Sequence, residues 1–284
     1  MVEFQVPEVD YTRYSNRQLA AVPLAVLVLA LLVLAGWWIA TGAPVTPGIE
    51  FTGGTEMRIQ TTASQTQIES TLDPVSVAPS QSAQNEYVVT FQGTNTQALE
   101  SQAQQAGYDV LSVQSTSASF GGKSQQLALY GLVAAFAGMS ILVFLMFRTF
   151  VPSIAVVLSA FSDIVIPLAL MNIVGIPLSL GTVAALLMLI GYSVDSDILL
   201  NNHILRRSGG FYESTYRAMR TGVTMTLTSL SAMAVMALVA FFFGINLLTS
   251  IGVVLVMGLA TDLMNTYMLN LSLLRWYKFE GVAR

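Results

Sequence analysis

Cysteine is absent from the 284 residues, histidine occurs once, and lysine occurs only at Lys123 and Lys278. Without cysteine the chain can form no disulfide, no thiolate metal site and no cysteine nucleophile. The single histidine, His203, also excludes a metal site built from several histidines. We therefore expect no metal and no cofactor.

Charged residues are scarce as well. They make up 10% of the chain, against about 25% in soluble domains, whereas hydrophobic residues make up 54%. This composition indicates a membrane protein. Acidic residues outnumber basic ones, which gives a net charge of −4 at pH 7. An acidic, lysine-poor exterior fits a cell that lives in high salt, because salt screens surface charge. We therefore expect a halophilic source.

Six apolar stretches are long enough to cross about 30 Å of hydrocarbon, which takes about 20 residues. They cover residues 19–40, 127–147, 151–171, 178–200, 222–243 and 247–274. The first is too long for the core of a signal peptide, so we interpret it as a retained anchor. The predicted fold class is a membrane all-α six-helix bundle. Residues 1–18 precede the first span, residues 127–274 hold spans two to six, and residues 275–284 form a tail.

The basic residues are distributed unevenly about these spans. Arg58 and Lys123 fall on one side, and the opposite side holds Arg13, Arg17, Arg148, Arg206, Arg207, Arg217, Arg220, Arg275, Lys278 and Arg284. The positive-inside rule places the larger set, with both termini, in the cytoplasm. We therefore predict a multi-pass protein of the cytoplasmic membrane whose residues 43–123 lie outside.

Residues 43–123 alternate between strand and helix patterns. The stretches "TEMRIQT", "EYVVTFQ" and "YDVLSVQST" favour strands. The stretches "SQTQIESTL" and "TNTQALESQAQQAG" favour helices, the first with Ser64 as its cap and the second closed by Gly107. If "PVSVA" is also a strand, the order is the β-α-β-β-α-β of a small α+β, ferredoxin-like domain.

Two stretches that could suggest a nucleotide or nucleic-acid site have simpler interpretations. "GIEFTGGTEM", residues 48–57, is rich in glycine but lacks the phosphate-binding pattern G-x-x-x-x-G-K-[ST]. We interpret it as a tight turn that leads into a strand. The arginines of "RRSGGFYESTYRAMR" are explained by membrane orientation, so we expect no nucleic-acid partner.

Four carboxylates fall within the apolar spans, namely Asp163, Asp195, Asp197 and Asp262. Ionisable residues in a membrane are costly to insert and are functional candidates by default. Asp195 and Asp197 lie about 200° apart around a helix, so they cannot both face one partner. We prefer Asp195 as the proton or ion carrier. Asp197 is then either a second relay member or a polar residue on the cytoplasmic side.

Arg220 is the candidate counter-charge for these carboxylates. It precedes "TGVTMTLTSLSAM", in which Thr221, Thr224, Thr228 and Ser231 form a face of small polar residues that could line a hydrated path. A nearby arginine favours an ionised aspartate, whereas apolar burial favours the protonated form. The alternative is that Arg220 only fixes the orientation of the chain.

Taken together, these stretches resemble the SecD/SecF family, and within it SecF, the smaller auxiliary subunit of the Sec protein-export machinery. The order of one span, an outside domain and five spans is similar over nearly the whole chain. "GIEFTGGT" resembles the family signature after the first span, and "FSDIVIP" carries Asp163 where the family tends to have an aspartate. "GYSVDSDILLNNHILRR" resembles the fourth-span motif, and "AMRTGVTMTLTSL" resembles the entry to the fifth span, where an arginine matches Arg220.

The resemblance implies partners and a mechanism. SecD and SecF pair as two six-span halves, similar to resistance-nodulation-division (RND) exporters. They are thought to use the proton motive force to draw a translocating polypeptide from the SecY channel, so the resemblance implies no enzymatic reaction. Bacterial SecF proteins usually have G-Y-S-I-N-D at this point, with the acidic residue at the position of Ser196. The shift to Asp195 suggests an archaeal form.

Two other functions stay open at this point. The first is a subunit of an RND-type exporter of small molecules or lipids. The second is an intramembrane aspartyl protease that uses Asp195 and Asp262, although "GLATD" in the sixth span differs from the G-x-G-D of such enzymes. Protons, sodium ions and no ion at all stay open as driving forces.

Overall fold

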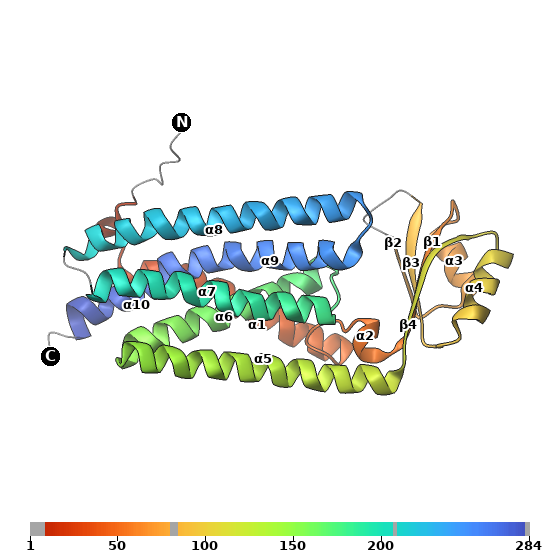
Figure 1. The fold of residues 1–284 in the computed structure, drawn as a ribbon, viewed down its shortest axis with the longest axis horizontal. Coiled ribbons are helices and arrows are strands. Elements are labelled where there is room, and N and C mark those ends of the chain that lie inside the picture. Colours follow the sequence, from red (N-terminus) through yellow and green to blue (C-terminus); the bar gives the residue numbers. More distant parts are fainter. Residues whose placement is uncertain (1–8, 80–84, 207–208, 282–284) are drawn as a thin grey trace.

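The computed structural model describes residues 9–79, 85–206 and 209–281. Long helices run side by side, and a small domain with a four-stranded sheet stands at one end of them (Figure 1). The start of the first long helix and the end of the last lie at the opposite end of the bundle. Arg207 and Arg284, two of the basic residues that predicted the orientation, lie outside the described residues.

Six helical segments of the described chain are long and apolar enough to span a membrane. They are α1 (Asn16–Thr41), α5 (Ala118–Phe147), α6 (Phe150–Val174), α7 (Leu180–Arg206), α8 (Phe211–Phe242) and a last segment that starts with α9 (Asn246–Met264). That last segment continues through the π-helical turns η2 (Asn265–Asn270), α10 (Leu271–Trp276) and the π-helical η3 (Tyr277–Gly281). The predicted six-helix bundle is confirmed.

Two of these helices begin well before the predicted spans. Helix α5 begins at Ala118 and α8 at Phe211, whereas the apolar stretches begin at residues 127 and 222. Residues 118–123, predicted as part of the outside domain, therefore belong to α5. Hydropathy identifies only the apolar part of a membrane helix. The helix itself extends to the residue that caps its first backbone N–H groups. Ser117 supplies that cap by accepting a hydrogen bond from the backbone N–H of Phe120.

The small domain has the predicted β-α-β-β-α-β order. Its elements are β1 (Gly54–Gln60), α3 (Gln65–Leu72), β2 (Ser76–Pro79), β3 (Glu86–Phe91), α4 (Thr96–Gln105) and β4 (Asp109–Thr116). The strands lie in the order β2-β3-β1-β4, and all neighbours are antiparallel. Alternate residues of β1 and β3, among them Met57, Ile59 and Val89, are fully buried in the core of this domain together with Ile68 of α3.

The glycine-rich stretch forms a helical turn, α2 (Ile49–Thr52), before the strand begins, and not simply a turn. Gly53 and Gly54 follow it with φ of +75° and +121°, a region that favours glycine. A Cβ on Gly53 would lie 2.6 Å from the backbone of Ala118, and one on Gly54 would meet the carbonyl of Phe91. The two glycines thus allow the start of β1, the end of β3 and the start of α5 to approach closely where the domain joins the bundle.

The domain is attached to the bundle on two sides. On one side the backbone of Gly48 donates to the carbonyl of Leu178 at 2.8 Å, and Leu178 donates to the carbonyl of Thr46 at 2.8 Å. On the other side Arg58 of β1 donates to the carbonyl of Gly244, between α8 and α9, at 2.8 Å. Arg58 also forms an ion pair with Glu86 of β3, which is only 5% exposed.

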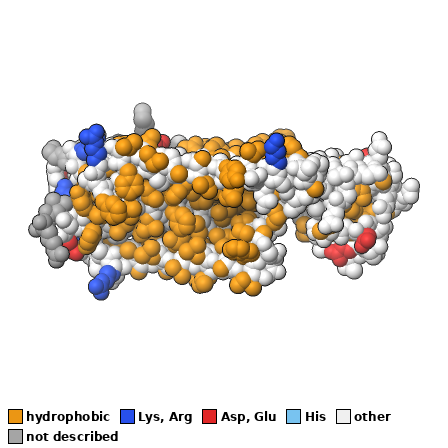
Figure 2. Space-filling model, turned by 90° about the horizontal axis from the view of Figure 1, so that it is seen from below, with side chains coloured by type: hydrophobic (Ala, Val, Ile, Leu, Met, Phe, Trp, Pro, Cys, Tyr) orange, Lys and Arg blue, Asp and Glu red, His pale blue; other side chains and the backbone are white. Residues whose placement is uncertain are grey.

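Within the bundle, α6 and α7 are mostly buried, whereas α5 and α8 expose most of their length. Hydrophobic side chains cover the bundle in Figure 2, and the charged side chains visible there lie toward its ends and on the small domain. This is the surface expected of helices that face hydrocarbon.

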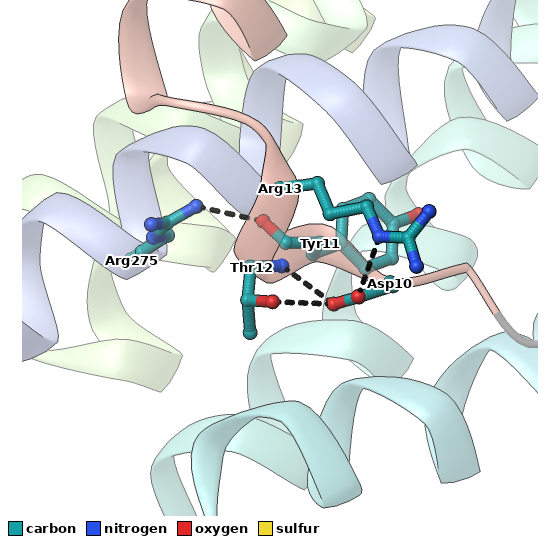
Figure 3. A network of polar contacts seen from close by, with 5 residues as sticks. All are labelled: Asp10, Tyr11, Thr12, Arg13 and Arg275. Atoms are coloured by element: carbon teal, nitrogen blue, oxygen red, sulfur yellow. Dashed lines mark hydrogen bonds and ion pairs between the residues drawn. The ribbon is translucent and has the colours of Figure 1, made fainter.

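A short turn, η1 (Tyr11–Arg13), precedes α1 and crosses the end of the bundle away from the sheet. Asp10 accepts hydrogen bonds from Thr12 and forms an ion pair with Arg13 (Figure 3). Arg275 of α10 donates to the carbonyls of Tyr11 and Tyr14 at 3.1 and 2.7 Å. The turn is therefore held by the last helical segment.

Candidate functional site

Three of the four membrane carboxylates lie in the interior of the bundle. Asp163 of α6, Asp197 of α7 and Asp262 of α9 are 1%, 0% and 2% exposed. The three helices that carry them pack against one another. Long apolar helices with central polar residues bury those residues against each other, because hydrocarbon offers them no hydrogen-bond partners.

Asp163 uses both of its carboxylate oxygens. Ser193 of α7 donates to Oδ2 at 2.6 Å, and the amide of Asn265 in η2 donates to Oδ1 at 2.6 Å. Asp163 thereby joins α6 to two other spans. An aspartate that bridges three helices holds their relative positions as long as it accepts both bonds.

Asp197 and Asp262 share one hydroxyl. Thr266 Oγ1 lies 2.9 Å from Asp197 Oδ1 and 3.2 Å from Asp262 Oδ1. Asp197 Oδ1 also accepts from the amide of Asn270 at 2.8 Å, and Asp262 Oδ1 accepts from Ser196 at 2.8 Å. A hydroxyl carries a single proton, so Thr266 can bond both carboxyls at once only if one of them is protonated and donates to it. The geometry therefore couples the proton of one carboxyl to the other.

The residues that bind these carboxylates come mainly from the π-helical stretch η2. Asn265, Thr266 and Asn270 are all buried, and each donates to an aspartate. Sequence reasoning did not single them out. A signal was present, because Asp262, Asn265, Thr266 and Asn270 recur at helical spacing in an apolar span. Turns with π-helical bonding often mark functional sites.

Several polar atoms of this interior have no partner within the described residues, among them Asp197 Oδ2, Ser159 Oγ, Ser162 Oγ and Asn201 Oδ1. In that part of the chain no arginine or lysine forms an ion pair with the three carboxylates. Burying several negative charges together is unfavourable unless protons or cations neutralise them. The described His, Asp and Glu residues form no group of three or more that could hold a metal ion. The network therefore buries three carboxyl groups with no basic partner among the described residues.

Asp195 and Arg220 lie elsewhere. Both are exposed on the surface of the bundle, and among the described residues no ion pair joins them. Asp195 and Asp197 do face opposite ways, as the helical geometry predicted, but the inward one is Asp197. The structure thus brings together Asp163, Asp197 and Asp262, and it leaves Asp195 and Arg220 outside that cluster.

The polar face predicted on the fifth span lies on the surface of α8. Thr221, Thr224, Thr228 and Ser231 are exposed. The hydroxyls of Thr224, Thr228 and Ser231 donate to backbone carbonyls four residues earlier, at 2.7 to 2.8 Å. The bonds of these three hydroxyls are therefore made within the helix.

The protease alternative needs two aspartates that face each other. Asp262 is buried and bonded to Ser196 and Thr266, whereas Asp195 is exposed on α7. The pair chosen from the sequence is therefore not a catalytic dyad.

Comparison with known proteins shows the family to which the chain belongs. Residues 96–280 match the family model described as "Protein export membrane protein SecD/SecF, C-terminal", and residues 38–65 match "SecD/SecF GG Motif". Proteins named "Protein-export membrane protein SecF" from Haloferax volcanii and Haloquadratum walsbyi are 70% and 66% identical to the chain. In both cases the match covers 100% of each chain.

The fold also matches a solved structure. The crystal structure of SecDF, described as a translocon-associated membrane protein, from Thermus thermophilus gives a TM-score of 0.74 at 19% identity. The match covers 98% of this chain and 40% of that one. The likeness shows a shared fold, and the sequence relatives show the family. The chain therefore belongs to the SecD/SecF family of protein-export membrane proteins.

Proposed function

We propose that the chain is an auxiliary subunit of the Sec protein-export machinery that works with a SecD partner. Relatives that match it end to end carry the name of a protein-export membrane protein. The chain spans about two fifths of the SecDF chain with the same fold, so a second half-bundle is the natural complement. Its role is to promote the passage of a polypeptide from the SecY channel across the cytoplasmic membrane. The relatives do not favour an exporter of small molecules or lipids.

The proposed orientation places the small domain outside and both ends of the chain in the cytoplasm. Its support is the position of the basic residues along the elements. Arg13, Arg17, Arg206 and Arg275 lie near the end of the bundle away from the sheet, whereas Arg58 lies in the sheet itself. A positive excess near one membrane face marks the cytoplasmic side.

We further propose that Asp163, Asp197 and Asp262 respond to the ion gradient. The observation that carries this proposal is the shared hydroxyl of Thr266, which lies within hydrogen-bond distance of two buried carboxyls. Gaining or losing a proton changes a carboxyl from donor to acceptor, so the bonds among α6, α7 and η2 must rearrange. Such a rearrangement would move α6 and α7, whose connection is hydrogen-bonded at Leu178 to the segment that leads into the small domain.

Asp195 and Arg220 have a different proposed role, as contacts with the partner subunit. Asp195 is exposed about 22 Å along α7 from Leu180, by the helical rise of 1.5 Å per residue. A carboxylate facing lipid at that depth costs at least about 2.5 kcal/mol. A second six-span half that covers this face would remove the cost, and the pair could then also serve the ion relay.

The test is the export rate of a secreted reporter in cells that carry each variant at matched membrane abundance. Asp163→Asn, Asp197→Asn and Asp262→Asn keep the shape of the side chain but remove its titration, so we expect each to slow export. Asp109→Asn, on the exposed edge of the small domain, is the matched control and should leave the rate unchanged.

Two further variants test the partner contact. Asp195→Asn and Arg220→Ala should reduce recovery of the partner subunit on purification and slow export. Normal export by all three buried variants would contradict the ion-coupling proposal. Normal recovery of the partner with both surface variants would contradict the contact proposal.

A further inference from the structure

An open groove lies beside the first helix, at the end of the bundle away from the sheet. Its volume is about 670 Å³, and its lining is mostly apolar. Tyr11 and Tyr14 of the N-terminal turn, Gln18, Leu19 and Val22 of α1, and Met268 of η2 contribute to the wall. Neither the buried carboxylates nor the contacts of the small domain involve these side chains.

The groove changes in polarity along the helix. Tyr14 and Gln18 lie at its polar end, and Ala21 and Val22 lie at its apolar end. From Gln18 to Val22 the axis of α1 advances about 6 Å, by the helical rise of 1.5 Å per residue, and Tyr14 precedes the helix. Because α1 spans the membrane, the groove runs from the membrane surface toward the hydrocarbon, with its polar end at the surface. A phospholipid likewise changes from a polar headgroup to an apolar acyl chain along its length.

The polar end carries an excess of positive charge. Arg17 shares a helical face with Ala21, is exposed, and has no hydrogen-bond or ion-pair partner for its side chain within the described residues. Arg13 is paired with Asp10. Arg275 donates to the carbonyls of Tyr11 and Tyr14, and its guanidinium lies 5.7 Å from the centre of the Tyr212 ring. Among the described residues of this turn, the start of α1 and the part of α10 that contacts the turn, three arginines thus stand against one aspartate.

The wall of the groove is held in place from behind. Tyr11 is buried and its hydroxyl donates to the sulfur of Met219 at 3.2 Å, while burial raises the pKa of Tyr11 to about 12. Arg275 also donates to the carbonyl of Tyr11, so contacts with α8 and α10 hold this turn (Figure 3). The groove is therefore a formed feature of the fold.

We propose that this groove binds one anionic phospholipid, whose acyl chain lies along Leu19, Val22 and Met268 and whose phosphate lies near Arg17. An acyl chain without a charged headgroup would contact the apolar wall but would leave the arginines without an anion. A free phosphate would leave the apolar wall uncovered. A phospholipid uses both. Arginine favours phosphate because its planar donors bind the oxygens in pairs.

The test uses the full chain, purified in a neutral detergent and stripped of lipid. Dioleoyl phosphatidylglycerol and dioleoyl phosphatidylcholine have identical chains and differ in headgroup charge. Each is titrated at one fixed salt concentration, and thermal unfolding and the number of bound lipids are measured by scanning fluorimetry and native mass spectrometry. Inorganic phosphate is titrated in parallel, to detect a site for phosphate alone.

Two variants change the polar end and the apolar end of the groove separately. Arg17→Gln removes the free cation, and Val22→Trp fills the apolar end. Arg148→Gln, an exposed cation at the end of α5, and Val28→Trp, an exposed position of α1 outside the groove, are the matched controls. We expect phosphatidylglycerol to bind with one lipid per chain and to raise the unfolding temperature, and phosphatidylcholine to bind several-fold more weakly. Both groove variants should abolish this difference, and neither control should.

Three results would overturn the proposal. The first is equal binding of the two lipids, and the second is phosphatidylglycerol binding that survives both groove variants. The third is an effect of inorganic phosphate that matches that of the lipid, which would indicate a phosphate site.

Discussion

At the scale of single residues, the hydroxyl of Thr266 stands between two buried carboxyls and within 3.2 Å of a second hydroxyl, that of Ser196. Its position differs from that of Thr224, Thr228 and Ser231 on α8, whose hydroxyls bond a carbonyl of their own helix. Removing Thr266 Oγ1 would leave carboxylate oxygens buried with fewer donors, which costs about 1–3 kcal/mol.

We therefore expect Thr266→Val to lower the free energy of unfolding by about 1–3 kcal/mol and to slow export. Thr228→Val is the matched control, because the Thr228 hydroxyl donates only to the carbonyl of Thr224, and it should change stability by less than about 0.5 kcal/mol. Thermal unfolding of the purified full chain in detergent measures the first effect, and reporter secretion measures the second. Equal behaviour of the two variants would show that the shared hydroxyl has no special role.

The sequence identified all three carboxylates of the cluster as candidates, since an aspartate in an apolar span is conspicuous. It could not tell which of Asp195 and Asp197 points inward. In a membrane helix the lipid-facing and the protein-facing sides are both apolar, so hydropathy does not reveal which side is buried. Helical geometry showed that the two aspartates face apart, but it could not show which of the two faces the protein interior.

At the scale of elements, local patterns predicted more of the fold than of the site. The alternation in β1 and β3 and the caps at Ser64 and Gly107 gave the order of the small domain. The π-helical stretch η2 could not be predicted, because its backbone geometry follows from packing of Asn265 and Asn270 against aspartates on other helices and not from local propensity.

The turn at Gly53 and Gly54 allows a prediction at this scale. Gly54→Ala must adopt a φ of +121° and place its Cβ against the carbonyl of Phe91, so we expect a clear loss of thermal stability and easier proteolysis of the small domain. Gly107→Ala is the control for the backbone alone, because Gly107 also has a positive φ but nothing within 4 Å of its Cβ position. That variant should lose only about 1–2 kcal/mol. A smaller loss for Gly54→Ala than for Gly107→Ala would contradict the close approach.

At the scale of the whole molecule, the exposed lengths of α5 and α8 are consistent with a half-bundle that joins another. Its orientation can be tested directly, because the chain has no cysteine. A single cysteine at Gln104, in α4, should react with a membrane-impermeant maleimide in intact cells. A single cysteine at Glu280, in η3, should react only after the membrane is permeabilised. Labelling of Glu280→Cys in intact cells, with protection of Gln104→Cys, would reverse the proposed topology.

The two chain connections of the small domain differ in length. Strand β4 ends at Thr116 and α5 begins at Ala118, so only Ser117 separates them, whereas residues 42–48 separate α1 from α2. The strand and the helix therefore meet at Ser117, with almost no chain between them. They measure about 26 Å and 45 Å, by the rises of strands and helices. If β4 and α5 turned together about Ser117, the far end of α5 would therefore move nearly twice as far as the far end of β4.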